Sequence, residues 1–181
     1  NLDLNNKNVV VIGGTRGIGL AIANGFANNK SNVIVISRKI KKFQNKNINH
    51  VKADATDIES MNAAKKVILN KMNNRIDIVI SNVGDGSLGK KSEESIDNWN
   101  ESWKINFNTC LHSALIFKSA LKNNRGVIIF TSSIAGIEEI GAPTAYSVAK
   151  SSLKSLCKSL SFKLAPEIRV NVVAPGNIFF K

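Results

Sequence analysis

The sequence predicts an α/β fold, a doubly wound parallel sheet with helices on both faces. Short runs rich in valine and isoleucine recur along the chain, and longer stretches with helical periodicity separate them. The runs do not alternate between apolar and polar residues, as expected of strands whose two faces are both covered. No internal repeat, linker or low-complexity segment interrupts this order, so residues 1–181 are interpreted as a single domain.

Five strands are strongly marked, and a sixth is weaker. The strong strands are Asn8–Gly13, Asn32–Ser37, Ile76–Ser81, Gly126–Ser132 and Arg169–Ala174, and the weaker one is Asn49–Ala53. Helices are expected over Gly17–Asn29, Ile58–Asn73, Trp99–Lys122 and Thr144–Leu164. This alternation indicates βαβ units, whose crossover connections make neighbouring strands parallel.

The net charge is +12, but the lysines are scattered and only RKIKK (residues 38–42) is locally dense. We interpret the charge as a generally basic, solvated surface, with attraction of anions as the alternative. A nucleic-acid partner is not expected, because neither a recognised binding motif nor an aromatic platform accompanies the lysines.

The cysteines and apolar runs indicate a cytoplasmic protein with no membrane partner. Cys110 and Cys157 lie far apart in apolar helical stretches, which fits buried thiols in a reducing compartment. No apolar run approaches the roughly 18 residues that span a bilayer. His50 and His112 have no partners at ligand spacing, so no metal site is expected.

Ligands of such sheets bind beyond the carboxyl ends of the strands, so the residues after each strand are the candidates for a site. After the first strand, GGTRGIG places Gly13, Gly17 and Gly19 at the start of a helix. Glycines allow close backbone approach, and the helix N-terminus attracts a pyrophosphate. The spacing G-x-x-x-G-x-G is neither G-x-G-x-x-G nor a Walker A motif, and a turn made only for packing is the alternative.

Ser37 and Arg38 follow the second strand, where sites that select NAD have an acidic residue. Arg16 in the glycine loop adds a second guanidinium, and two such groups suit a ribose 2′-phosphate. The sequence therefore favours NADP(H) over NAD(H). The alternative is that Arg38 only contacts solvent.

The only tyrosine, Tyr146, precedes Lys150 by four residues in a predicted helix, so both side chains lie on one face. A cation beside a phenol favours the phenolate, which would make Tyr146 a proton donor near neutral pH. In so lysine-rich a chain this spacing also arises by chance. Small or polar residues also follow the other strands: Asp54, Asn82, Gly84, Ser132, Ser133, Pro175 and Gly176.

In this order, the motifs resemble the short-chain dehydrogenase/reductase family, in its single-domain branch. Gly13-x3-Gly17-Ile18-Gly19 is similar to the family's cofactor loop, and Tyr146-x3-Lys150 to its signature, with Ser133 placed 13 residues before the tyrosine. The other matching positions are Asp54, Asn82-Val83-Gly84, Asn106 in WKINFNT, and Pro175-Gly176. The resemblance implies an NAD(P)-dependent oxidoreductase that interconverts a carbonyl and a secondary alcohol.

The resemblance also implies four catalytic roles. Tyr146 would exchange a proton with the substrate oxygen, and Lys150 would favour the ionised phenol and bond the nicotinamide ribose. Ser133 would orient the substrate, and Asn106 would help to position a water. The residues expected to bind the cofactor are Gly13, Thr15, Arg16, Gly17, Ile18, Gly19, Ser37, Arg38, Asp54, Ala55, Asn82, Val83, Gly84, Tyr146, Lys150, Pro175 and Gly176.

Three departures from the family pattern leave an alternative open, a non-catalytic dinucleotide-binding protein of the same fold. Ile12 replaces a threonine, and Phe180 stands where a threonine often bonds the carboxamide. The chain ends at Lys181, before the family's substrate-binding region, so a longer parent chain is expected. The resemblance also implies a homodimer or homotetramer, because the family's corresponding helices pack between subunits, and the two long helices here are rich in apolar residues. The expected substrate is a small carbonyl or alcohol compound, and the basic surface favours anionic ones.

Overall fold

The computed structural model describes residues 3–87 and 95–178. Six parallel strands form one sheet in the order β3-β2-β1-β4-β5-β6. The order reverses between β1 and β4, which makes this the point where a doubly wound sheet opens a crevice at its carboxyl edge. The predicted fold class is confirmed, and it is Rossmann-like.

All six predicted strands are present, with bounds that differ by at most two residues from the predicted ones. They are β1 (Asn8–Ile12), β2 (Asn32–Ser37), β3 (Ile48–Lys52), β4 (Ile78–Ser81), β5 (Val127–Thr131) and β6 (Arg169–Val173). Side chains of β1 are buried on both faces of the sheet: Val10 and Ile12 join one apolar core, and Val9 and Val11 join the other. Burial on both sides explains why the apolar runs show no alternation.

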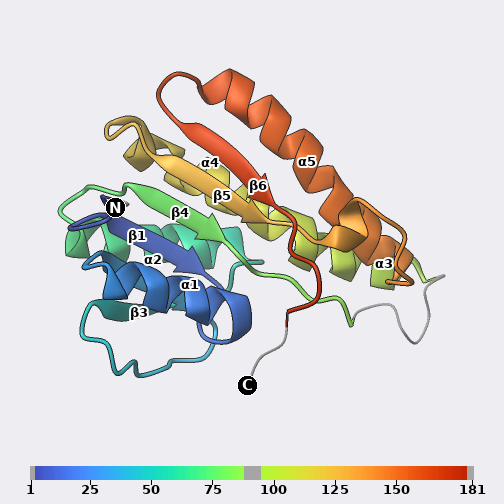
Figure 1. Cartoon of the computed structure of the whole chain (residues 1–181), viewed down its shortest axis with the longest axis horizontal. Coiled ribbons are helices and arrows are strands. Elements are labelled where there is room, and N and C mark those ends of the chain that lie inside the picture. The colour runs from blue at the N-terminus through green and yellow to red at the C-terminus, as the bar shows by residue number, and fades with distance from the viewer. Residues whose placement is uncertain (1–2, 88–94, 179–181) are drawn as a thin grey trace.

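The helices divide unequally between the two faces (Figure 1). The face that carries the larger core is covered by α2 (Ile58–Lys71), α4 (Thr109–Lys122) and α5 (Thr144–Leu164). Among the helices of the described residues, only α1 (Gly17–Asn28) contributes to the opposite core, through Ala23 and Ala27. Residues 38–47, all of them described, connect β2 to β3 without a helix.

The prediction of one helix over Trp99–Lys122 is wrong in its details. The segment is divided into α3 (Ile96–Trp103), a π-helical turn η1 (Lys104–Asn108) and α4. A π-turn accommodates one extra residue in the helix, and it widens the hydrogen-bonding pattern locally. The Thr109 hydroxyl donates to the Ile105 carbonyl oxygen at 2.8 Å across this turn. The hydrophobic periodicity of the sequence does not reveal a single inserted residue, so the π-turn was not predicted. Such turns are frequent at functional sites.

Both cysteines are free and buried, as the sequence predicts: Cys110 is part of α4 and Cys157 is part of α5. In the described ranges, no helix has the length and apolarity needed to cross a membrane. A cytoplasmic location stays a prediction.

Candidate active site

A cleft of about 1230 Å³ runs along the carboxyl ends of the strands. It extends from the glycine loop after β1, across the ends of β2 and β4, to the first turns of α5. The predicted site residues that line it are Gly13, Thr15, Arg16, Gly17, Ile18, Ser37, Arg38, Asp54, Ala55, Asn82, Val83, Gly84, Tyr146 and Lys150. The structure therefore brings together the predicted phosphate, adenine and catalytic regions in one depression.

The glycine loop depends on backbone conformations and contacts that side chains would prevent. Gly13 and Gly17 have positive φ angles of +82° and +53°. Gly19 is buried and does not line the cleft; a Cβ there would collide with the carbonyl oxygen of Gly13 and lie 2.7 Å from Nδ2 of Asn82. That amide also donates to the Gly13 carbonyl oxygen at 3.3 Å. Gly19 thus lets α1 begin directly beneath the loop.

Asp54 is held as an anion at the end of β3. Its carboxylate accepts hydrogen bonds from the backbone N–H and the hydroxyl of Thr56, at 2.9 and 2.8 Å. Desolvation alone would raise the pKa of Asp54, but the Thr56 bonds and the positive charges of Arg38 and Lys104 outweigh it and lower that pKa. Asp54 is therefore ionised at neutral pH and acts as an acceptor at the cleft wall.

Lys150 lines the cleft beside Tyr146, although its side chain is almost fully buried. It is only 3% exposed, its Nζ donates to the Thr131 carbonyl oxygen at 2.9 Å, and Nζ lies 5.9 Å from the centroid of the Tyr146 ring. Desolvation lowers the pKa of Lys150, and interaction with Cys110 opposes this in part. The ammonium is therefore fixed next to the phenol, as the predicted pairing requires.

Two glycines of the loop after β4 let its backbone pack closely against Lys150 and Tyr146. A Cβ added at Gly84 would lie 2.8 Å from Nζ of Lys150, and one at Gly86 would lie 3.5 Å from Cζ of Tyr146. Gly84 was predicted to bind the cofactor, and the lack of a side chain there also leaves room for the lysine. Gly86 follows the same strand end and also lines the cleft.

Asn106 is fully buried and does not line the cleft. Its Oδ1 accepts from the Asp85 N–H at 2.8 Å, and its Nδ2 donates to the Asp85 carbonyl oxygen at 3.1 Å and to the Ser102 hydroxyl at 3.3 Å. The side chain therefore clamps the loop after β4 to the π-turn. Its predicted role in positioning a water is not visible in these side-chain contacts.

Ser133 and the Pro175-Gly176 turn lie beside the cleft rather than in its lining. The Ser133 hydroxyl accepts from the Ala135 N–H at 3.2 Å and so begins the short 3-10 helix η2 (Ile134–Gly136). Ile134 in turn donates to the Pro175 carbonyl oxygen at 2.9 Å, which places the turn after β6 next to this helix. The neighbouring Ser132 does line the cleft, and its hydroxyl donates to the Lys150 carbonyl oxygen at 2.7 Å.

Several lining residues were not predicted. Most of them sit at strand ends or in the π-turn region: Ile36, Lys39, Ala53, Thr56, Glu101, Lys104, Ile105 and Thr131. The strand ends were available as a signal, because Thr131 is the last residue of β5. Lys104 and Ile105 carried no such signal, since they reach the cleft only through the π-turn. In the described residues, no group of three His, Cys, Asp or Glu side chains gathers as a metal site.

Residues 7–179 match the family model described as short chain dehydrogenase. This chain belongs to the short-chain dehydrogenase family. The match includes the glycine loop, the π-turn and the Tyr146–Lys150 pair, so the family assignment and the cleft rest on the same residues.

Curated short-chain dehydrogenases are similar over most of this chain. A cis-2,3-dihydrobiphenyl-2,3-diol dehydrogenase of Pseudomonas putida is 30% identical, covering 98% of this chain and 68% of its own length. A 3-oxoacyl acyl-carrier-protein reductase of Chlamydia trachomatis is 29% identical, covering 96% and 74%. Among solved structures, a ligand-free aldohexose dehydrogenase of Thermoplasma acidophilum superposes with a TM-score of 0.89 at 27% identity, covering 96% of this chain and 68% of that one.

Proposed function

We propose that this short-chain dehydrogenase is an NADP(H)-dependent oxidoreductase that interconverts a carbonyl and a secondary alcohol. The observation that carries the proposal is that Tyr146 and Lys150 share one cleft with the glycine loop. Family membership supports a nicotinamide cofactor. The preference for the 2′-phosphorylated form rests on Arg16, Arg38 and Lys39, which line the other end of the cleft.

The residues of the cleft fit a dinucleotide. Gly17 and the start of α1 would offer backbone N–H groups to a pyrophosphate. The Gly13 N–H already donates to the Ile36 carbonyl oxygen at 2.9 Å, so Gly13 contributes only the lack of a side chain at the loop. Asp54 would accept from the adenine amine, and Asn82, Val83 and Gly84 would face the cofactor across the cleft. When bound, the nicotinamide supplies or accepts the hydride.

The protein's own part is to move a proton and hold the substrate. Tyr146 would give the proton to the carbonyl oxygen in reduction and remove it from the alcohol in oxidation. Lys150, fixed by Thr131, would stabilise the ionised phenol and bond the nicotinamide ribose. Ser133 would orient the substrate oxygen. Asn106 would keep the loop after β4 in place around both groups.

The substrate is proposed only as a class, a small carbonyl compound or secondary alcohol. The basic surface favours anionic members of that class. We propose that residues 85–95 form one wall of the substrate pocket; most of them, and Phe180, lie outside the described residues. We further propose that the whole chain works as one cofactor-binding and catalytic domain, located in the cytoplasm.

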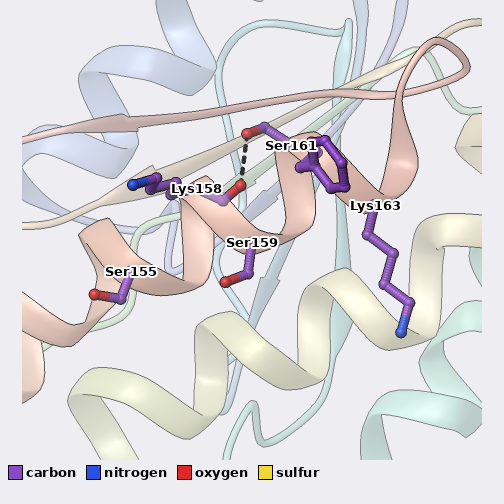
Figure 2. A pocket seen from close by; sticks show the side chains of 6 residues that line it. Ser155, Lys158, Ser159, Ser161 and Lys163 are labelled. Carbon is purple, nitrogen blue, oxygen red and sulfur yellow. Dashed lines mark hydrogen bonds between the residues drawn. The ribbon is translucent and has the colours of Figure 1, made fainter.

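We also propose that the protein assembles as a homodimer or homotetramer through α4 and α5. Apolar side chains remain exposed on both helices: Leu115 at 45%, Val148 at 40% and Phe162 at 90%. The outer face of α5 carries a hollow of about 1010 Å³ lined by residues between Ser155 and Lys163 (Figure 2). Three of its six lining residues are serines, whose small side chains would allow a helix of a second subunit to approach, and Phe162 would supply the apolar contact.

Replacing Tyr146 by phenylalanine tests the proposed chemistry directly. The variant keeps the ring that packs near Gly86 and loses only the hydroxyl. We expect NADPH oxidation with a panel of carbonyl compounds to fall by at least about 100-fold, because the proton donor is gone. NADPH affinity, followed by nicotinamide fluorescence, should stay within about twofold, because few contacts are lost. Turnover equal to that of the wild type would refute the assignment.

A non-catalytic dinucleotide-binding protein is the second candidate. It is favoured by the position of Ser133 and Asn106, which lie outside the cleft lining and are engaged by the backbone. It predicts tight NADPH binding without turnover of any carbonyl compound in the panel. Reproducible NADPH oxidation that depends on Tyr146 would exclude it.

A further inference from the structure

His50 takes part in a hydrogen-bond chain that connects two strands and the turn after β2. Its Nε2 lies 2.8 Å from the Ser37 hydroxyl oxygen, and the same hydroxyl donates to the Lys39 carbonyl oxygen at 2.8 Å. In the sheet register, Val35 pairs with His50, and Ser37 is two residues beyond Val35 on β2, so the His50 and Ser37 side chains lie on the same face of the sheet. These hydrogen bonds therefore join β3 to the residues that follow β2.

The positions of the protons in this chain are determined by the chemistry of its ends. A backbone carbonyl oxygen only accepts, so the single hydroxyl proton of Ser37 points to Lys39. His50 must then donate its Nε2–H to Ser37. Both the neutral ring with the proton on Nε2 and the imidazolium provide this donor. Ser37 has consequently no proton left to donate to a ligand.

The turn fixed in this way carries the cations at the adenosine end of the cleft. Arg38 and Lys39 are exposed and line the cleft opposite Arg16. Within the described residues, neither arginine donates a hydrogen bond to another protein group. The following segment is attached at a second place, because Lys41 Nζ donates to the Thr15 carbonyl oxygen at 2.8 Å in the glycine loop. Phe43 packs against the core under α1 and anchors the segment further.

We propose that His50 is a positioning residue for cofactor selectivity: through Ser37 it fixes the Ser37–Lys39 turn, so that Arg38 and Lys39 meet the ribose 2′-phosphate of NADP(H). This rests on the proposed NADP(H) preference. It assigns Ser37 the part of a brace within the turn rather than that of a phosphate donor. A less ordered turn would still admit NAD(H), because that ribose carries no phosphate for the two cations to bind.

The test compares NADPH and NADH affinity of the purified protein by nicotinamide fluorescence. For His50→Ala we expect NADPH to bind about three- to tenfold more weakly and NADH to change less than about twofold, as for the loss of one hydrogen bond that serves only the phosphate. His50→Gln, whose amide N–H reaches as far, should recover most of the NADPH affinity. Asn49→Ala is the matched control, because Asn49 is exposed on the same strand and faces the other way.

A double-mutant cycle separates positioning from a general loss of structure. Ser37→Ala breaks the same chain, so the His50→Ala/Ser37→Ala protein should bind NADPH no more weakly than either single variant. The role of His50 would be overturned if His50→Ala weakened NADPH and NADH binding equally, or if the affinity losses in the cycle were additive. It would also be overturned if Asn49→Ala weakened NADPH binding as much as His50→Ala does. A wild-type protein that prefers NADH would instead refute the proposed NADP(H) preference, and this inference with it.

Discussion

At the scale of one residue, the buried ammonium of Lys150 lowers the stability of the fold for the sake of the candidate site. An ammonium that is 3% exposed and has one carbonyl partner is an unfavourable group to bury. Desolvation lowers the pKa of Lys150 from 10.5, and only the interaction with Cys110 opposes it. The fold therefore retains a charge that its packing disfavours, as expected of a residue kept for chemistry.

Replacing Lys150 by methionine should stabilise the protein and abolish its activity. Methionine fills a similar volume without a buried charge, so we expect the free energy of unfolding to rise by about 1 kcal/mol or more. NADPH-dependent turnover should fall by at least about 100-fold. Thermal denaturation and the carbonyl panel measure the two effects; a clear loss of stability would contradict this account of Lys150.

The sign of the pH dependence follows from the lowered pKa of Lys150. Between its folded and unfolded pKa values, the unfolded chain binds more protons at this site, so stability rises with pH across that interval. The stability advantage of Lys150→Met should therefore be largest near neutral pH and shrink as the pH approaches about 10. An advantage that is constant over this range would indicate a packing effect instead.

At the scale of the element, two glycines of α1 differ in whether the structure requires them. Gly19 faces the glycine loop, where a Cβ would collide with backbone. Gly25 lies two turns further along α1, and a Cβ there would meet nothing within 4 Å. The first glycine is required by a close approach, whereas the second only weakens the helix.

Gly25→Ala should raise the free energy of unfolding by about 0.5–1 kcal/mol, or about 1–4 °C in melting temperature, because alanine restricts the unfolded chain and favours the helix. Its NADPH affinity should be unchanged. Gly19→Ala, in the same helix, should lower stability and NADPH affinity together, because the loop must move away from α1. Differential scanning fluorimetry with and without NADPH compares the pair, and matching behaviour of the two variants would contradict the assignment.

At the scale of the whole molecule, exposed apolar surface on α4 and α5 favours assembly. Phe162 lines the hollow on α5 and is 90% exposed, whereas Val67 lies on α2 and is 45% exposed. Symmetric association would bury each α5 contact twice. The two positions therefore form a matched test of where the subunits meet.

Phe162→Asp should weaken self-association at least about tenfold, because burying an aromatic side chain contributes about 1.5–3 kcal/mol and the contact occurs in both subunits. Val67→Asp should leave self-association unchanged. Analytical ultracentrifugation at micromolar concentration gives both values. Monomeric wild-type protein, or equal effects of the two substitutions, would contradict an α5 interface.

The sequence by itself determined the six strands, their parallel direction, the glycine loop and the four-residue spacing of Tyr146 and Lys150. These features are local: apolar runs reveal buried strands, and a spacing of four places two side chains on one helix face. Fold and family were predicted for this reason, and all six strands are confirmed. The sequence did not predict the contacts of side chains whose partners lie far away along the chain.

Only the tertiary structure decided how the residues around that pair are used. It inserted the π-turn at Asn106, directed that amide to Asp85, placed Ser133 beside the cleft and joined His50 to Ser37. Each of these contacts depends on strand register or on packing between segments far apart in the chain, and neither is encoded by local periodicity. Lys150 is the clearest case: its spacing from Tyr146 is written in the sequence, whereas its burial and its lowered pKa arise from the whole sheet and α4 closing over it.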